Sequence, residues 1–312
     1  MIGKNDPIYL AGHKGLLGSS ILRNLEKKGF KNVITRNSSQ LDLINQNKTF
    51  KFIKKYKPKC IIIAAAFVGG IKANNDFKAD FIYKNTMINT NLIHSAYLNK
   101  IKNLIFFGSS CAYPKFSKQP IKEKYLLTDS LEKTNEPYAV AKISGIKMCE
   151  SYSNQYSLNY KCLMPCNTFG PNDNYNLETS HFFPALIRKI HEIKIKKKNK
   201  LVVWGNGKAR RELIYVDDIA EACIYFMNKK IKEPIINIGT GKDFTINEYI
   251  EMIKKVILPN KKLKIVYDHS KPNGTPQKLL NISLAKKYGW KSKIDLERSI
   301  RETYKIFLRS KI

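Results

Sequence analysis

Short runs of apolar residues alternate with longer segments of helical periodicity through the first half of the chain. Runs that are apolar at every position predict buried strands, and apolar positions three and four residues apart predict the helices that cover them. The expected strands lie near residues 8–11, 32–35, 60–65, 103–107 and 160–164. The expected helices lie near residues 19–28, 47–56, 86–98 and 138–156. This alternation predicts an α/β fold with a doubly wound parallel sheet.

The pattern changes after residue 165, and the change predicts a second, smaller α/β lobe. The expected elements are a turn-rich loop at 167–174, a helix over 184–194, a strand at 201–204, a helix from 217, a strand of the first sheet at 235–238, and amphipathic helices at 245–257 and 295–309. We therefore expect a nucleotide-binding domain over 1–170 with a returning segment at about 215–239. The substrate lobe is expected to comprise 171–214 and 240–312.

A glycine-rich turn joins the first expected strand to the first expected helix. Its residues are Gly12, His13, Lys14, Gly15, Leu16, Leu17 and Gly18. Glycines here let the backbone turn tightly and approach a pyrophosphate, and the helix N-terminus offers N–H groups to phosphate oxygens. Three glycines spaced GxxGxxG can also form a plain tight loop. The strand–turn–helix order nevertheless favours a dinucleotide site on a Rossmann-type domain.

The end of the second expected strand bears on the choice of dinucleotide. Residues 36–39 are Arg-Asn-Ser-Ser, so no acidic residue stands there to hold a free ribose 2′-hydroxyl. Lys14 and Arg36 are cations that suit a 2′-phosphate, and we expect NADP(H) rather than NAD. The alternative is that both are exposed cations in a lysine-rich chain.

Tyr138 and Lys142 stand four residues apart on an expected helix, and therefore on one face of it. Pro137 precedes them at a position where a helix can begin without losing a hydrogen bond. Ser109 follows the strand at 103–107 and can hold a carbonyl oxygen next to the phenol. We expect the lysine ammonium to lower the pKa of Tyr138. Such a set would handle a proton at an oxygen while a hydride moves at its carbon.

Composition excludes several classes of protein. The chain carries 56 Lys and Arg against 25 Asp and Glu, a net charge of +31, but basic residues are spread along its whole length without an aromatic-interleaved motif. We expect a general lysine bias, together with attraction of a polyanionic small substrate, rather than a nucleic-acid partner. The six cysteines form no CxxC pair, which predicts no metal site, no disulfide framework and a cytoplasmic protein. The polar start is no signal peptide, and the longest apolar run is too short for a bilayer.

Several longer motifs carry a resemblance to a known family. They are Ala11-Gly12-His13-Lys14-Gly15, Val68-Gly69-Gly70-Ile71, Gly108-Ser109-Ser110-Cys111-Ala112-Tyr113-Pro114, Asn135-Glu136-Pro137-Tyr138, Gly170-Pro171-Asn172-Asp173-Asn174, Ser180-His181, Trp204-Gly205-Asn206-Gly207 and the segment from Lys271 to Leu280. Together they resemble the extended short-chain dehydrogenase/reductase family, and within it the enzymes that epimerise and reduce GDP-4-keto sugars. The likeness covers nearly the whole chain.

The resemblance implies 3,5-epimerisation and NADPH-dependent 4-reduction of GDP-4-keto-6-deoxy-D-mannose to GDP-L-fucose, in a homodimer. It implies that Ser109, Tyr138 and Lys142 act in the reduction. Cys111 and His181 match the family's epimerisation pair, and a thiol and an imidazole can both titrate near neutral pH. Without the resemblance, Cys111 would be interpreted as a small packed residue and His181 as an exposed loop residue.

The resemblance also implies ligand contacts outside the glycine turn. Those to the cofactor are Arg36, Lys142, Pro165, Asn167 and His181. Those to the substrate are Asn167, Lys189, Trp204, Arg211 and Lys278. Arg211 suits a phosphate because a guanidinium binds it through two hydrogen bonds, although a surface ion pair with Glu212 is the alternative. Trp204 either stacks on guanine or packs against its strand.

We weigh three other functions, of which the first is the hardest to exclude. An enzyme acting on another GDP-4-keto sugar, such as a heptose, would differ in pocket shape, which the sequence does not give. A catalytically silent nucleotide-binding protein is disfavoured by the complete set of candidate catalytic residues. A 4,6-dehydratase would need an acidic residue after Ser109, where Ser110-Cys111-Ala112 has none.

Overall fold

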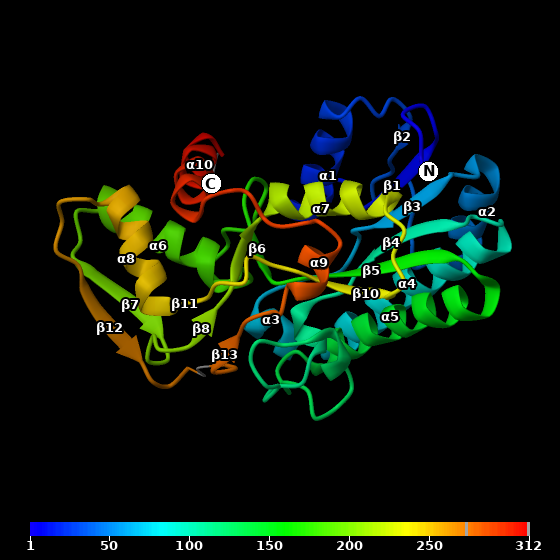
Figure 1. Cartoon of the computed structure of the whole chain (residues 1–312). Coiled ribbons are helices and arrows are strands. Elements are labelled where there is room, and N and C mark those ends of the chain that lie inside the picture. Colours follow the sequence, from blue (N-terminus) through cyan, green and yellow to red (C-terminus); the bar gives the residue numbers. More distant parts are fainter. Residues whose placement is uncertain (272–273, 311–312) are drawn as a thin grey trace.

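The computed structural model describes residues 1–271 and 274–310, and six of its strands form one parallel sheet (Figure 1). Across the sheet the order is β2 (Val33–Ile34), β1 (Ile8–Ala11), β3 (Cys60–Ile63), β4 (Asn103–Phe107), β5 (Asn159–Pro165) and β10 (Ile235–Ile238). Ile8 of β1 stands opposite Val33 on one side and Cys60 on the other. The chain order reverses at β1, and nucleotides bind beyond the strand ends at such a reversal. The predicted doubly wound α/β fold is confirmed.

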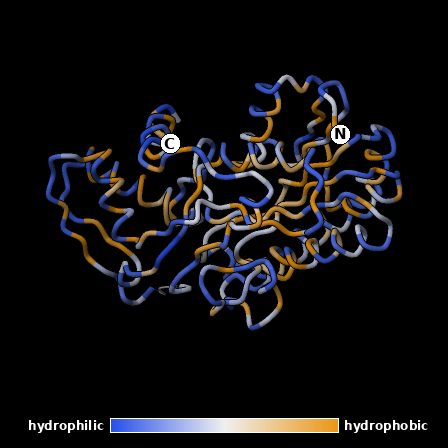
Figure 2. The backbone as a smooth tube through the Cα atoms, in the orientation of Figure 1, coloured by the Kyte–Doolittle hydropathy of each residue, from blue (hydrophilic) through white to orange (hydrophobic). Residues whose placement is uncertain are grey.

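Helices cover both faces of this sheet, which explains why its strands are mostly apolar on both sides. One face carries α2 (Gln46–Tyr56), α4 (Lys78–Leu98) and α5 (Glu136–Tyr156), which pack against one another. The other face carries α1 (Leu16–Lys27) and α7 (Val216–Asn228), seen above the sheet in Figure 1. All residues of β1 and β3 are buried. Figure 2 shows the resulting concentration of hydrophobic positions along the central strands.

A second group of elements has its own apolar core. It contains α6 (Phe182–Ile195), α8 (Ile246–Ile257), α10 (Leu296–Arg309) and the parallel strands β7 (Lys200–Trp204) and β12 (Lys264–Asp268). Phe183, Tyr249 and Phe307 are among the buried side chains at its centre. This lobe lies beside the large sheet in Figure 1, with α6 and α8 against each other.

Short strands lie between the two cores and connect them. One small sheet has the order β11 (Phe244–Thr245), β8 (Arg210–Arg211) and β13 (Gln277–Lys278), and a separate pair joins β6 (Asn167–Phe169) to β9 (Leu213–Tyr215). In the first of these, Arg211 stands opposite Lys278. Residues 167–169 were expected to form a loop but form β6, because strands of two or three residues carry no hydrophobic period.

The path of the chain differs from the expected boundaries after residue 279. The expected substrate lobe took in all of 240–312, but Leu280, Ile282 and Trp290 are buried in the core of the large sheet. This stretch includes the short helix α9 (Ser283–Lys287), which packs on β10. The helix expected at 86–98 begins earlier, at Lys78, and is preceded by α3 (Ile71–Asp76).

The helices of the described ranges were also compared with the requirements of a bilayer. Both α4 and α5 reach 21 residues. Across residues 1–271 and 274–310, no helix combines the length and apolar character needed to cross a membrane.

Candidate active site

The glycine turn between β1 and α1 is shaped by contacts that exclude larger residues. Gly12 has a φ of +87°, and a Cβ there would lie 2.5 Å from the backbone nitrogen of Ala65, just beyond β3. A Cβ on Gly18 would lie 2.0 Å from the carbonyl oxygen of Gly12. Gly15 is the N-cap of α1 and supplies no side-chain cap, so the first N–H groups of the helix suit a phosphate. The turn fits a dinucleotide.

Arg36, just past β2, is held in a defined orientation. Its guanidinium lies 5.2 Å from the ring centroid of Tyr56, and Nη2 donates to the Tyr56 hydroxyl at 2.7 Å. Nη1 donates to the carbonyl oxygen of Thr35 at 2.6 Å. Lys14 is exposed in the glycine turn, and Arg36 follows the neighbouring strand of the same sheet. Two cations near one strand edge suit a phosphate on the ribose.

Within the glycine turn, the charged imidazolium form of His13 is disfavoured. Burial lowers the pKa of His13, and the neighbouring Lys14 lowers it further. The neutral imidazole therefore predominates at neutral pH, and Lys14 supplies the positive charge of the turn.

Ser109, Tyr138 and Lys142 come together beyond the end of β4. Ser109 precedes a short 3-10 turn, Ser110–Ala112, and its Oγ accepts the N–H of Cys111 at 3.2 Å. Tyr138 stands in the first turn of α5, and the Ser109 side chain hydrogen-bonds to it. Lys142, one helical turn later, is buried with its Nζ 5.7 Å from the Tyr138 ring centroid.

The expected lowering of the Tyr138 pKa is wrong. Burial raises the pKa of Tyr138, nearby Cys111 raises it further, and the hydrogen bond from Ser109 offsets only part of this. The Lys142 ammonium donates instead to the carbonyl oxygen of Phe107 at 2.8 Å, and burial lowers the pKa of Lys142 to about 8. Tyr138 is thus protonated at neutral pH and suited to donate a proton to an oxygen anion.

Cys111 is approached by a lysine of the connecting sheet. All six cysteines fall within the described ranges, and Cys111 is the one whose side chain is not buried. Lys278 of β13 donates from Nζ to the Cys111 Sγ at 3.5 Å. His181 is the solvent-accessible N-cap of α6, and it lies near enough for the charge of Lys278 to act on it. The protein packed around His181 lowers its pKa, and Lys278 lowers it further.

Arg211 lies beside Lys278 with its guanidinium held by backbone carbonyl groups. Nη1 donates to Thr275 at 2.6 Å and to Arg210 at 2.8 Å. Glu212 does not form the surface ion pair with Arg211 that was the alternative interpretation. Glu212 is fully buried and accepts backbone N–H groups from Gly241 at 2.7 Å and Leu280 at 2.8 Å. Successive residues of a strand face opposite sides, which separates the two side chains.

Trp204 ends β7 with its ring exposed, so the interpretation as a packed strand residue is wrong. Its side chain is 42% exposed. Lys189 of α6 places Nζ 5.9 Å from the ring centroid, and Lys271 does so at 5.6 Å. Lys189 also donates to the carbonyl oxygen of Val202, and burial lowers its pKa. An exposed indole between two cations suits an aromatic ligand that carries negative charge.

The remaining predicted contacts lie at the end of β5 and the start of β6. Pro165 is the last residue of β5, and Asn167 is the first of β6, opposite Leu213. Both side chains are half-buried at this carboxyl edge. Pro272 and Asn273, in the motif that starts at Lys271, lie outside the described residues.

Glu132 is a functional candidate that sequence reasoning missed. It is buried in the loop before α5, and its carboxylate pairs with Lys115 at 2.8 Å. Burial opposes ionisation of Glu132, but the hydrogen bonds from Lys115 and the Thr134 N–H and the charges of Lys115 and Lys278 together outweigh it, so its pKa is lowered. The Glu132 carboxylate also interacts electrostatically with the Arg211 guanidinium. Polar residues surround Glu132 in a loop without periodicity, so no sequence signal marks it.

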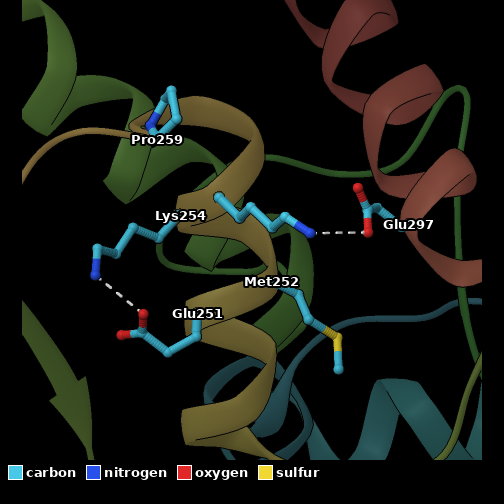
Figure 3. Close-up of a pocket in the computed structure, with 6 residues that line it drawn as sticks. Glu251, Met252, Lys254, Pro259 and Glu297 are labelled. Atoms are coloured by element: carbon cyan, nitrogen blue, oxygen red, sulfur yellow. Dashed lines mark hydrogen bonds and ion pairs between the residues drawn. The ribbon is translucent and has the colours of Figure 1, made fainter.

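A surface pocket elsewhere contains none of these residues. It lies between α8 and α10 and is lined by Glu251, Met252, Lys254, Lys255, Pro259 and Glu297. Figure 3 shows Lys254 turned toward Glu251, and the two form an ion pair of 3.0 Å. Lys255 forms a second ion pair with Glu297 at 3.4 Å. Nothing in its lining resembles the clustered side chains beyond β4. Within the described part of the chain, no three His, Cys, Asp or Glu side chains are grouped to hold a metal ion.

Residues 8–239 match the model of the NAD dependent epimerase/dehydratase family, and the chain belongs to this family. It is 45% identical to GDP-L-fucose synthase 1 of Arabidopsis thaliana over 310 residues, which cover 99% of this chain and 95% of that protein. A GDP-6-OMe-4-keto-L-xylo-heptose reductase from C. jejuni matches with a TM-score of 0.91 at 35% identity, over 99% of both chains. A GDP-L-fucose synthetase from Naegleria fowleri bound to NADP matches with a TM-score of 0.88 at 26% identity, over 99% of this chain and 96% of that one.

Proposed function

We propose that this protein is an NADPH-dependent enzyme that epimerises GDP-4-keto-6-deoxy-D-mannose at C3 and C5 and reduces its 4-keto group to give GDP-L-fucose. One observation carries the proposal. Ser109 links the two candidate residue sets, because it hydrogen-bonds to Tyr138 and also accepts the N–H of Cys111. Two chemistries on one sugar ring require such neighbours. The similarity to GDP-L-fucose synthase 1 over nearly the full length supports the choice of substrate.

Epimerisation falls to Cys111 and His181. The 4-keto group makes the hydrogens at C3 and C5 acidic, because the electrons left behind are delocalised onto its oxygen. One side chain must remove each proton and another must return a proton to the opposite face of the ring. The thiol comes from the turn after β4 and the imidazole from the start of α6. Their origin on different elements supports approach from two sides.

Reduction falls to Ser109, Tyr138 and Lys142, with bound NADPH supplying the hydride to C4. Ser109 donates a hydrogen bond to the 4-keto oxygen and holds it near the phenol. Tyr138 then gives its proton to that oxygen, a role that its raised pKa supports. Lys142, anchored on the Phe107 carbonyl, places positive charge behind the phenol as it loses the proton.

The nucleotides are bound by groups on opposite sides of this centre. NADP(H) is held by the glycine turn, with Arg36 and Lys14 at its 2′-phosphate, and Pro165, Asn167 and His181 are assigned contacts at its nicotinamide end. Arg211 and Lys278 are assigned to the diphosphate of the sugar nucleotide, with Asn167 adding a polar contact. Trp204 stacks on guanine, flanked by Lys189. The exposed indole and its two lysines support this assignment.

The protein is further proposed to form a homodimer through α4 and α5. Ile82 and Tyr83 of α4 and Val140 of α5 are exposed although apolar or aromatic. A second copy covering these helices would remove that surface from water. We place the enzyme in the cytoplasm, since its six cysteines are all free, as a reducing compartment requires.

Absorbance of NADPH during incubation with GDP-4-keto-6-deoxy-D-mannose, followed by identification of the sugar product, tests the proposal. Oxidation that yields GDP-L-fucose supports both half-reactions. Oxidation that yields GDP-D-rhamnose retains the reductase and removes the epimerase. Oxidation with a GDP-4-keto heptose alone would favour the alternative substrate class. Folded protein that binds NADPH and oxidises it with neither sugar would contradict the proposal.

A further inference from the structure

Lys278 occupies a position that a contact to the nucleotide alone does not explain. Its ammonium lies 3.5 Å from Cys111 Sγ, closer to this side chain than a lysine serving only a distant diphosphate needs to be. The side chain is half-buried, so the interaction is only partly screened by water. The pairing of β13 with β8 holds Lys278 opposite Arg211, and this fixes the backbone from which it reaches Cys111.

Charged and titratable groups from every neighbouring element converge on Cys111. Lys278 comes from β13 and Arg211 from β8, and the charge of Arg211 interacts with Cys111. Tyr138 comes from α5 and is neutral, because burial raises its pKa. Glu132 interacts with the charges of both cations and is itself paired with Lys115. The net charge around the sulfur is therefore positive.

This positive surrounding matters because a cysteine side chain takes up a proton only as the thiolate. An adjacent ammonium stabilises the thiolate and does nothing comparable for the neutral thiol. The same charge disfavours the imidazolium form of His181 and lowers its pKa. The ammonium of Lys278 therefore faces both candidate epimerisation residues.

We propose that Lys278 is a positioning residue for epimerisation, whose ammonium donates to Cys111 Sγ and stabilises the negative charge of the sulfur when it acts as the base. The proposal rests on the proposed function for its purpose. In the step it serves, the proton of the C–H bond passes to Sγ and the electron pair of that bond becomes the enolate of the 4-keto group. His181, after taking up a proton from solvent, delivers it to the opposite face of the same carbon and restores the ketone.

Alkylation of Cys111 by iodoacetamide at neutral pH, followed by mass spectrometry, measures the reactivity of the sulfur. The other five cysteines are buried, so the modification reports on this site. Lys278→Met should slow alkylation about fivefold, as loss of a partly exposed ion pair would. Lys278→Arg should keep most of the rate, because it restores the charge. Lys255→Met, at an exposed position of α8, is the matched control and should react like wild type.

Equal alkylation rates in Lys278→Met and wild type would overturn the proposal. Thermal unfolding and NADPH binding confirm that each variant is folded. If Lys278→Met does not fold, the rate in wild type is measured against salt concentration: slowing as salt rises supports the pair, and no change overturns it. The alkylation assay needs no sugar, so its failure is distinguishable from a failure of the proposed function.

With active enzyme, a second readout separates this role from substrate binding. A pure diphosphate contact would raise KM for the sugar nucleotide and leave deuterium exchange at saturation unchanged. The thiolate role predicts a lower maximal rate of exchange at C3 and C5 in Lys278→Met, partly recovered in Lys278→Arg. A raised KM with wild-type exchange and wild-type alkylation would contradict the proposal.

Discussion

The two candidate chemistries of this site are built in different ways. Ser109, Tyr138 and Lys142 all belong to the large parallel sheet and its helix α5, so one core fixes their mutual geometry. Cys111 stands on that same edge, but His181 caps α6 of the second core, and Lys278 lies on β13 of the small sheet between the two cores. The comparison indicates that reduction depends on local spacing, whereas epimerisation depends on how the lobes meet. The predictions below follow from this difference.

Tyr138→Phe removes the proposed proton donor and should have the largest effect. Loss of a positioned acid slows the step it serves by roughly a thousandfold, so NADPH oxidation should nearly stop. Deuterium exchange from solvent into C3 and C5 should continue, because Cys111 and His181 remain. NADPH absorbance and NMR of the recovered sugar measure the two steps. Normal oxidation would remove Tyr138 from its proposed role.

Cys111→Ser should slow epimerisation rather than reduction. A serine hydroxyl ionises far less readily than a thiol, so exchange at C3 and C5 should slow roughly a hundredfold. NADPH binding should be unchanged, since the glycine turn and Arg36 are untouched. NMR of the sugar in deuterated buffer gives the exchange rate, and fluorescence of bound NADPH is the control. Unchanged exchange would defeat the assignment.

Glu212→Gln tests a buried carboxyl group between the two cores, which accepts the backbone N–H groups of Gly241 and Leu280. Burial raises the pKa of Glu212 to about 7, above its ordinary value of 4.5. Between these values the folded state keeps a proton that the unfolded state releases, so the stability contributed by this group falls as pH rises. From about pH 4 to about pH 8 the loss is on the order of 3 kcal/mol.

The measurement for Glu212 is urea unfolding of wild type and Glu212→Gln at both ends of that range. Glutamine does not ionise, so the free energy of unfolding of wild type relative to the variant should decline with rising pH. Other titrating groups are common to both proteins and cancel in the difference. A difference that stays constant would show that the carboxyl group does not titrate in this range.

Arg36→Ala should have the smallest effect and should be confined to the first core. Losing a hydrogen-bonding cation at the 2′-phosphate should weaken NADPH binding about tenfold while leaving NADH binding nearly unchanged. Lys31→Ala, an exposed cation before the same strand, serves as the control. Titration of cofactor fluorescence measures both affinities. An equal loss for NADPH and NADH would place Arg36 elsewhere than at the 2′-phosphate.

Sequence alone predicted the elements of the large sheet well. Apolar runs predicted β1 and β4 at their observed positions, and helical periodicity predicted α5. A four-residue spacing was enough to place Tyr138 and Lys142 on one helix face. These signals are local, since each depends on a continuous segment that must bury one side.

The rest required tertiary structure. Strands such as β8 and β13 are two residues long, so no period marks Arg211 or the lysine that reaches Cys111. The burial of Glu132 and Glu212 depends on loops that meet only in the folded chain. The pKa of Tyr138 was predicted in the wrong direction because burial, which spacing does not report, raises it, while the Lys142 ammonium donates to the Phe107 carbonyl oxygen instead.

The most direct test of the account follows one turnover of the wild-type enzyme in deuterated buffer with unlabelled NADPH. The account predicts GDP-L-fucose that carries deuterium at C3 and C5, exchanged with solvent, and protium at C4, delivered from the cofactor. NMR of the product distinguishes all three positions. A reduced sugar that keeps protium at C3 and C5 would contradict the claim that both chemistries share this site.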